Sequence, residues 1–227
     1  MSISQFFFAD PDRTPNPSEI PDSDPVKPIA LLSAQELGEL NARSNLKGAL
    51  QLAGHLAVMG VSGYLWASQI DRPLLALPAL VLYGFTLASM FATMHECSHR
   101  TAFANNRVND MVCWLAGLLS FYNGTFYRRY HKWHHRYTQI PGKDPELEDP
   151  KPVSMGQYLL ELSALPWWIG KLKTHFRIAL GKVEDYPYIP ETARSEVIHS
   201  VRLQLLAYGV AIVISIIVML AASKSIA

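Results

Sequence analysis

Residues 74–94 read LLALPALVLYGFTLASMFATM, and residues 95–99, directly after them, read HECSH. The first stretch carries no charge, and an apolar run of about 20 residues is long enough to cross a bilayer as a helix. Such a run must be helical because lipid offers its backbone no other hydrogen-bonding partner. The two stretches together predict a membrane-spanning helix that ends in a pair of histidines at the membrane surface.

Two further apolar runs predict membrane spans, Gly48–Ile70 and Leu203–Ala222. The first has no formal charge and is separated from residues 74–94 by the short turn Asp71–Pro73, so the pair predicts a helical hairpin across the bilayer. Charged residues make up 17% of the chain, below the share of about 25% that is usual in soluble proteins. The predicted fold class is all-α: an integral membrane helical protein with three spans plus interfacial helices.

The N-terminal residues differ in composition from the rest of the chain. Residues 9–28 are rich in proline and aspartate, a composition that cannot bury a core. We therefore expect residues 1–32 to form a disordered tail and residues 33–227 to form one membrane domain. The domain is expected to start with a helix, because Ser33 and Glu36 have the spacing of a capping box.

Two apolar runs between the second and third predicted spans are too short to cross a bilayer. Val112–Phe121 has about half the length that a span needs, so it predicts an interfacial or buried helix. Tyr158–Ile169 contains Glu161 and the pair Trp167-Trp168, and tryptophan is enriched at the interface between membrane and water. We expect this second run to anchor the chain at the membrane surface.

Basic residues predict the orientation of the chain in the membrane. Six of them follow the span at residues 74–94: Arg100, Arg107, Arg128, Arg129, Lys132 and Arg136. Lysine and arginine accumulate in cytoplasmic loops, so the histidines and the N-terminal tail are predicted to be cytoplasmic. The glycosylation sequon at Asn123 would then lie in the cytosol, and we interpret it as a chance match. A net charge of +1 gives no footprint for nucleic acid, which we do not expect as a partner.

Five of the eight histidines fall in two short windows. The first cluster is His95 and His99, which are four residues apart and therefore share one face of a helix. The second cluster is His131, His134 and His135, whose spacings of three and four residues also share a face. Imidazole suits iron, zinc and copper, so the pattern predicts a metal site without selecting the metal.

The other polar residues near these windows have weaker signals. Glu96 is interpreted as an outer partner of a metal ligand, as a further ligand or as a solvated acid. His55 is expected to pack between helices, and His175 to belong to a basic interfacial helix. His199 is expected to be exposed or to cap a helix. The two cysteines, Cys97 and Cys113, do not read as a disulfide framework and fit a reducing, cytosol-facing environment.

The two clusters belong to longer motifs, HECSHR at residues 95–100 and HKWHH at residues 131–135. These motifs resemble the first two histidine boxes of the membrane fatty acid desaturase and hydroxylase superfamily. The segment PGKDPE at residues 141–146 also resembles the loop that follows the second box in many members. The resemblance covers about residues 45–222.

The resemblance implies a non-haem di-iron oxidoreductase of lipid metabolism. Such an enzyme uses dioxygen and two electrons to attack an unactivated C–H bond of a lipid acyl chain, and a fatty acid desaturase is favoured over a hydroxylase. The implied iron ligands are His95, His99, His131, His134 and His135. An external electron donor, such as ferredoxin or a cytochrome, would reach the irons at the cytosolic surface, and an acyl chain would reach them from the bilayer.

The sequence departs from the family pattern in one respect. The family carries a third histidine box after a fourth span, and neither His175 nor His199 reproduces its spacing. We therefore expect residues 33–227 to be C-terminally incomplete relative to the family. We also expect the 227 residues alone to be inactive as a desaturase.

Other functions stay open at this point. A carotenoid or lipid hydroxylase, or a ketolase, would use the same scaffold and the same metal. A catalytically incompetent membrane fragment or partner subunit would keep the clusters without turnover. A zinc-dependent membrane hydrolase would also use histidine clusters, although the spacing of the two motifs disfavours it.

Overall fold

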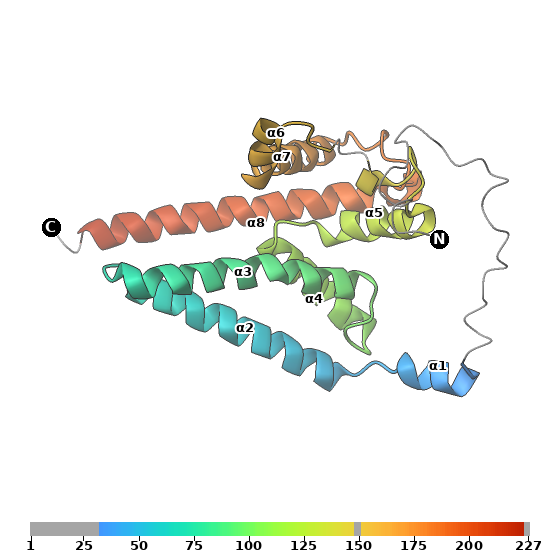
Figure 1. Cartoon of the computed structure of the whole chain (residues 1–227), viewed down its shortest axis with the longest axis horizontal. Coiled ribbons are helices and arrows are strands. Elements are labelled where there is room, and N and C mark those ends of the chain that lie inside the picture. The colour runs from blue at the N-terminus through green and yellow to red at the C-terminus, as the bar shows by residue number, and fades with distance from the viewer. Residues whose placement is uncertain (1–31, 148–150, 225–227) are drawn as a thin grey trace, which may run out of the picture. The chain divides into compact units, whose positions relative to one another are not determined.

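The computed structural model describes residues 32–147 and 151–224, and every regular element in these two ranges is a helix (Figure 1). In chain order the elements are α1 (Ala34–Leu40), α2 (Asn45–Ser68), α3 (Pro73–Ser98), α4 (Asn106–Leu119), α5 (Gly124–Tyr137), the 3₁₀ turn η4 (Pro145–Leu147), α6 (Met155–Leu162), α7 (Leu165–Ala179) and α8 (Glu191–Lys224). The predicted all-α fold class is confirmed. Residues 1–31 of the predicted tail lie outside the described residues.

The chain divides into two units, residues 1–42 and residues 43–227. The described part of the first unit is essentially α1, which begins where the sequence predicts. The Ser33 hydroxyl accepts a hydrogen bond from the Glu36 backbone, and the Glu36 carboxylate accepts one from the Ser33 backbone N–H at 2.7 Å. The predicted capping box is therefore confirmed.

Helices α2 and α3 pair as an antiparallel hairpin within the second unit (Figure 1). Pro73 starts α3 at a position where the first turn needs no backbone donor. A hydrogen bond of 2.7 Å joins Nε2 of His55 in α2 to the Thr86 carbonyl in α3, and the Trp66 and Tyr83 rings stack with centroids 6.0 Å apart. His55 thus packs between helices, as its isolated position predicts.

Two helices are long and apolar enough to cross a membrane, α3 over Pro73–Ser98 and α8 over Glu191–Ala221. The first predicted span, Gly48–Ile70, forms α2 but does not meet the same standard of hydropathy in the described residues. The reason lies in its composition, since Gln51, His55 and several glycines and serines dilute the apolar residues. Of the three predicted spans, two are therefore candidates by length and composition, and α2 is their less apolar partner helix.

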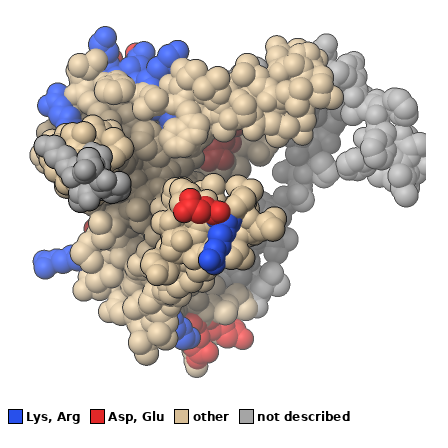
Figure 2. All heavy atoms as spheres, turned by 90° about the vertical axis from the view of Figure 1, so that its left-hand side faces the viewer, with Lys and Arg blue, Asp and Glu red and all other residues tan. Residues whose placement is uncertain are grey.

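The faces of the two spans are apolar and open. Val81 and Phe85 of α3 are 71% and 72% exposed, and Leu206 and Ile217 of α8 are 63% and 59% exposed. Figure 2 views the side of Figure 1 where the C-terminal end of α8 and the turn between α2 and α3 lie. Most side chains on this side are uncharged, and the charged ones form small patches. Exposed apolar surface of this extent indicates contact with lipid rather than water. Together with the helical content, it indicates an all-α membrane protein.

The core that supports the histidines lies between α3, α4 and α5. Met90 and Met94 of α3 are buried against Val112 and Ala116 of α4. Helix α5 comes close to α4 because Gly124 has no side chain, and a Cβ there would lie 2.5 Å from Cys113 Sγ. The predicted helix at Val112–Phe121 is thus buried on the face that packs under α3, whereas Leu115 and Leu119 on its other face are 47% and 40% exposed.

Helix α8 begins well before the predicted span at Leu203. Ala193, Val197 and Val201 recur every four residues along its first part, and all three are buried. Asn123, at the N-terminus of α5, donates hydrogen bonds to Ser200 (3.0 Å) and Gln204 (2.9 Å) of α8. Asn123 is 5% exposed, so its buried side chain has a structural role, in keeping with a chance sequon.

The apolar run Tyr158–Ile169 divides between α6 and α7. The break lies at Ala164, whose φ of 57° is left-handed, and Pro166 follows in the first turn of α7. Trp167 and Trp168 are 40% and 43% exposed. Helix α7 packs against α8, and His175 of α7 is buried.

Candidate metal centre

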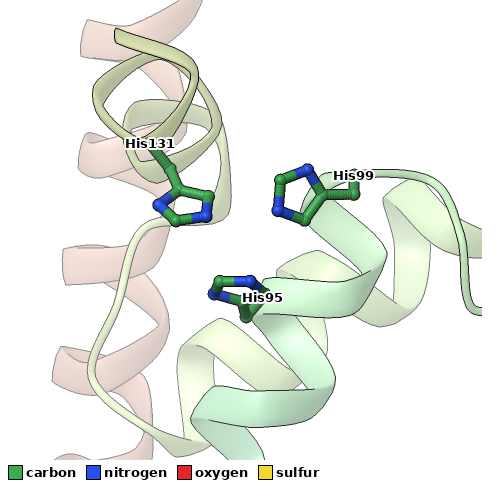
Figure 3. Close-up of side chains that lie close together, drawn as sticks. All are labelled: His95, His99 and His131. Carbon is green, nitrogen blue, oxygen red and sulfur yellow. The ribbon is translucent and has the colours of Figure 1, made fainter. Parts of the chain in front are cut away.

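The last two turns of α3 and the middle of α5 bring the histidine clusters together. His95 and His99 leave α3 on one face, and His131 approaches them from α5 (Figure 3). One nitrogen from each of these three rings lies within 4.8 Å of the others. Two helices far apart in the sequence thus direct three imidazoles into one space, as in a site that can hold a metal ion.

His135 extends this group from the next turn of α5. Its Nε2 lies 3.0 Å from Nε2 of His131, and its ring centroid lies 5.1 Å from that of His99. Two nitrogens that bind one metal at ~2.1 Å on adjacent corners have about this separation. The same distance fits a hydrogen bond between two neutral rings, so the pair is arranged for either state.

His134 stands at the edge of the group. Its ring centroid is 5.6 Å from that of His131 and 5.7 Å from that of His135. Its Nδ1 donates a hydrogen bond to Oδ1 of Asp144 at 2.8 Å. Its other nitrogen, Nε2, lies on the opposite side of the ring from Asp144. The structure therefore places all five histidines side by side, with three in the tight group and two next to it.

His131 is the most enclosed of the five. The residue is 6% exposed, and its Nδ1 is buried with no hydrogen-bond partner in the described part of the chain. Burial, and then the neighbouring His95, His135, His99 and His134, lower the pKa of His131 to about 4. The ring is therefore neutral near pH 7, the form that binds a metal.

Tyr127 fixes the orientation of His95. A hydrogen bond of 2.9 Å joins its hydroxyl to Nδ1 of His95, one turn of α5 before His131. The Tyr127 ring also stacks on the His131 ring with an interplanar angle of 14°. A ligand histidine usually has its second nitrogen held in this way, which sets the tautomer and aims the first nitrogen.

A turn after α5 supplies two carboxylates. Gly142 has a φ of +72°, a conformation that glycine adopts freely because it has no side chain. A hydrogen bond from Trp133 Nε1 to the Lys143 carbonyl (2.9 Å) stabilises the turn. Asp144 follows, and its side chain is fully shielded from solvent. Glu146 comes next: its Oε2 lies 3.5 Å from Nε2 of His134, and its Oε1 lies 3.9 Å from Nδ1 of His131.

Asp110 of α4 holds the two helices in register. Its carboxylate accepts hydrogen bonds from Arg100 (2.8 Å) and Arg128 (2.6 Å). Arg100 directly follows the first histidine cluster, and Arg128 lies one turn before His131 in α5. Arg128 also donates to the Ser98 carbonyl at the end of α3 (3.0 Å). The ion pairs therefore connect the end of α3 to the start of α5, with α4 as the bridge.

The remaining predicted polar residues lie elsewhere. Glu96 is exposed, and its carboxylate accepts a hydrogen bond from the Thr101 hydroxyl at 3.1 Å. His199 is exposed on α8 two turns after the start of the helix, so of its two expected roles the structure supports the exposed one. His175 belongs to the basic helix α7 as expected, and it is buried at 4% exposure, with its ring centroid 5.1 Å from that of Phe121.

Three residues near the clusters were not predicted as site residues: Tyr127, Asp144 and Glu146. Tyr127 precedes His131 by four residues, so the helical spacing that grouped the histidines also placed it on their face. Asp144 and Glu146 belong to the segment PGKDPE, whose resemblance to a family loop was a signal. Their closeness to His134 depends on the turn at Gly142, which a spacing rule does not give.

The fatty acid desaturase family matches residues 72–224, from the start of α3 to the end of α8. A known relative, the sn-1 oleoyl-lipid 12-desaturase of Picosynechococcus sp., is 33% identical over 132 residues. This match covers 53% of the present chain and 38% of the relative, so the chain spans well under half of the relative's length. No solved structure matches the chain.

Proposed function

Because this chain belongs to the fatty acid desaturase family, we propose that its histidine clusters hold iron and that it oxidises C–H bonds of lipid acyl chains with dioxygen. The observation that carries the proposal is the group formed by His95, His99 and His131, whose nitrogens lie within 4.8 Å of one another. Such chemistry needs a site that is histidine-rich, shielded from water and open to lipid.

The residues of the site fit a metal ion. Nε2 of His131 lies 3.0 Å from Nε2 of His135, a separation that two ligands of one metal ion have. The histidines of both clusters would hold the iron: His95, His99, His131, His134 and His135. Bound iron would supply the redox chemistry that lets dioxygen and two electrons remove hydrogen from an unactivated C–H bond.

The surrounding side chains prepare the ligands. Asp144 orients His134, and Tyr127 orients His95, so two of the five rings have one nitrogen fixed before a metal binds. Phe91 packs at ring-centroid distances of 6.0 Å from His95 and 5.5 Å from Tyr127. Phe91 thus gives the cluster an apolar side next to His95 and Tyr127, whereas His99 and His135 are exposed.

A cavity beside the clusters is suited to an acyl chain. It has a volume of about 600 Å³ and is lined by Phe91, Tyr122, Tyr127, Trp167 and Ile178 among others. Tyr127 and Glu146 border both the cavity and the histidines. A chain in this cavity would pass along an aromatic wall and reach the metal site at Tyr127.

We favour desaturation over insertion of oxygen because the relative from Picosynechococcus is a desaturase of an oleoyl lipid. Hydroxylation or ketolation of a carotenoid or another lipid would be a different outcome on the same scaffold. Electrons would come from an external donor such as ferredoxin or a cytochrome, and the basic residues after α3 would place the site on the cytoplasmic side.

A finer part of the proposal concerns the number of ligands. Five clustered histidines and nearby carboxylates are few donors for two irons, each of which takes several. We propose that turnover requires a further histidine-bearing segment, supplied with or beside residues 1–227. A chain that binds iron only weakly and acts as a partner subunit would be the opposing outcome.

The test is expression of residues 1–227 in a host that lacks the relevant unsaturated lipids, alone and together with the C-terminal half of a homologous desaturase. Mass spectrometry of the lipids distinguishes loss of two hydrogens from gain of an oxygen, and metal analysis of the purified chain distinguishes iron from zinc. The variant His134→Ala, expressed together with the C-terminal half, tests whether a ring at the edge of the histidine group is needed for product.

We expect iron in the purified chain, desaturated lipid only with the C-terminal half present, and no product from His134→Ala. Zinc in place of iron, or unchanged lipids under every condition, would overturn the proposed function. Product from residues 1–227 alone would overturn only the requirement for a further segment.

A further inference from the structure

Helices α6 and α7 belong to a segment that starts beside the histidine clusters. At this start, Oε2 of Glu146 lies 3.5 Å from Nε2 of His134. The first turns of α8 lie on the same side of the molecule, because Arg129 of α5 forms an ion pair of 2.6 Å with Glu196 of α8. The segment runs on from α7 into α8, so it both starts and ends on the side of the histidines.

Helix α7 runs alongside α8 in the opposite direction (Figure 1). The last residue of α7, Ala179, accepts a hydrogen bond of 2.7 Å from Arg202 through its carbonyl. Near the other end of α7, the Trp168 ring packs on Phe121, and Phe121 stacks on Tyr208, with centroids 5.1 Å and 4.9 Å apart. Tyr208 lies inside the third predicted span, whereas Arg202 directly precedes it. Helix α7 therefore extends from the start of this span toward its interior.

The length of α7 takes it into the hydrocarbon layer but not across it. Its 15 residues measure about 22 Å at 1.5 Å per residue, whereas the hydrocarbon core is about 30 Å thick. At the N-terminal end of α7 the chain turns at Ala164, whose φ of 57° is left-handed, and Pro166 follows in the first turn. Helix α6 contacts α7 and has only 8 residues. The two helices form a hairpin with its tip at Ala164.

One face of α7 is apolar and exposed. It consists of large side chains at helical spacing: Leu165, Trp168, Ile169, Leu172 and Phe176. Each of them is at least 42% exposed, and Leu159 and Leu162 of α6 are 59% and 63% exposed. Because α7 runs beside α8, this face lies at the depth of the span. Apolar surface of this extent at that depth indicates contact with acyl chains rather than with water.

The charged residues of the hairpin lie off this face or near its open end. Glu161 and Lys171 line the cavity beside the clusters, and ionisable groups at membrane depth usually face such a cavity. Lys173 lies within two turns of the C-terminal end of α7, from where its long side chain can reach the membrane surface. Arg177 is one turn closer to that end and pairs with Asp185. The charges are thus compatible with a hairpin whose tip is in lipid.

We propose that α6 and α7 form a re-entrant hairpin, which enters the bilayer from the side of the histidine clusters, places its tip among the acyl chains and leaves on the same side. Its partner is the hydrocarbon of that leaflet and not the headgroup surface, where the tryptophan pair alone would place it. The inner side of α7, with Trp167, Gly170 and Thr174, lines the cavity. The hairpin is therefore the wall between this cavity and the surrounding lipid.

Two single cysteines test the depth of the tip. Ser163→Cys places a thiol next to Ala164, and Ser154→Cys places one directly before α6, and both serines are exposed. The full chain in phospholipid vesicles is treated on both sides with a membrane-impermeant maleimide. Because this reagent needs a thiolate in water, we expect Ser163→Cys to react roughly tenfold more slowly than Ser154→Cys. Both should react alike after the vesicles are dissolved in a denaturing detergent.

Tryptophan fluorescence gives a second measure of depth. The vesicles contain phosphatidylcholine with bromine either near the headgroup end or near the methyl end of its acyl chains, and bromine quenches a nearby tryptophan. The Trp168→Phe variant identifies the part of the signal that belongs to Trp168, which we expect the deeper bromine to quench more strongly. The control is Trp133→Phe, because Trp133 is bonded to the Lys143 carbonyl beside the histidine clusters. The signal of Trp133 should not favour the deeper bromine.

Equal labelling of the two cysteines, or stronger quenching of Trp168 by the shallow bromine, would overturn the proposal in favour of a hairpin that lies on the membrane surface. Protection of Ser163→Cys without quenching of Trp168 by either lipid would also overturn it, because protein would then cover this face. Circular dichroism checks that each variant keeps its helices. Neither measurement depends on bound metal, so the result is independent of the proposed function.

Discussion

Asp144 Oδ1 accepts a hydrogen bond from Nδ1 of His134 at 2.8 Å, and the Asp144 side chain has no exposed surface. The other oxygen, Oδ2, accepts from the Gln139 backbone at 2.8 Å, and Oδ1 also accepts from the Glu146 backbone at 3.0 Å. Burial raises the pKa of Asp144, but these three hydrogen bonds outweigh it and lower the pKa below its usual range. Asp144 is thus an ionised group that holds one ring of the second cluster.

Asp144→Asn tests whether this contact prepares a metal ligand. The amide keeps the size of the side chain but loses the charge that holds His134, so iron affinity should fall by roughly 10- to 100-fold. Competition with a chelator of known affinity measures the change. Asp185→Asn is the control, because Asp185 is exposed and pairs with Arg177 away from the clusters. An equal loss in both variants would show a general effect of charge instead.

Glu146 and Glu96 form a matched pair of carboxylates near the clusters. Glu146 lies 3.5 Å from His134 Nε2, whereas Glu96 is bonded to Thr101 on the exposed side of α3. Glu146→Gln should therefore weaken iron binding several-fold, and Glu96→Gln should leave it nearly unchanged. Iron content after dialysis measures both. The reverse order would mean that the acid within the first motif, rather than the acid after the turn, supports the metal.

Tyr127→Phe removes only the hydroxyl that is bonded to His95. The ring can still stack on His131 and pack against Phe91, so the helices should keep their thermal stability. Because the tautomer of His95 is no longer fixed, iron affinity should fall by roughly tenfold. Tyr64→Phe, at a residue that is 71% exposed, is the control. Unchanged affinity in Tyr127→Phe would mean that the hydroxyl does not orient the ligand.

Much of this arrangement follows from local spacing. The capping box at Ser33 and the facing of His95 and His99 depend on residues within one helical turn, and a sequence shows these directly. The burial of His175 and the position of Glu146 could not be predicted, because they depend on α8 packing against α7 and on a turn bringing a loop back to α5. The early start of α8 could have been predicted, because Ala193, Val197 and Val201 recur every four residues. This spacing gives the helix an apolar face that begins before the predicted membrane span.

The ion pairs around Asp110 predict a pH dependence of stability. Burial raises the pKa of Asp110, but hydrogen bonds and charge from Arg100 and Arg128 lower it below its ordinary value of 3.8. A carboxylate whose pKa is lowered by folding stabilises the fold above its unfolded pKa, and the contribution is lost as pH falls through the lowered pKa. Because all three side chains are about one-third to one-half exposed, screening limits the effect to about 1 kcal/mol.

Asp110→Asn should therefore destabilise the chain at pH 7 and make little difference at a pH well below 3.8, where the wild-type group is also protonated. Thermal unfolding of both proteins in the same detergent, followed by circular dichroism at the two pH values, measures this convergence. A gap between wild type and variant that is the same at both pH values would show that the carboxylate acts through packing rather than charge.

The last prediction concerns the topology in the membrane. If α2 and α3 both cross, Ser44 at the start of α2 lies on the same side as the histidine clusters, and the turn at Asp71 lies on the opposite side. Helix α8 would then return its C-terminal end to the side of Asp71. The prediction extends to Ser225, which lies outside the described residues.

Single cysteines at Ser44, Asp71 and Ser225, treated with a membrane-impermeant maleimide in oriented vesicles, test this arrangement. The native Cys97 and Cys113 are buried, and burial raises the pKa of Cys113 to about 11, so its thiol reacts slowly near neutral pH. We expect Asp71 and Ser225 to be labelled from one face and Ser44 from the other, which is cytoplasmic. Labelling of Ser44 and Asp71 from the same face would mean that α2, the less apolar helix, lies along the membrane surface instead of crossing it.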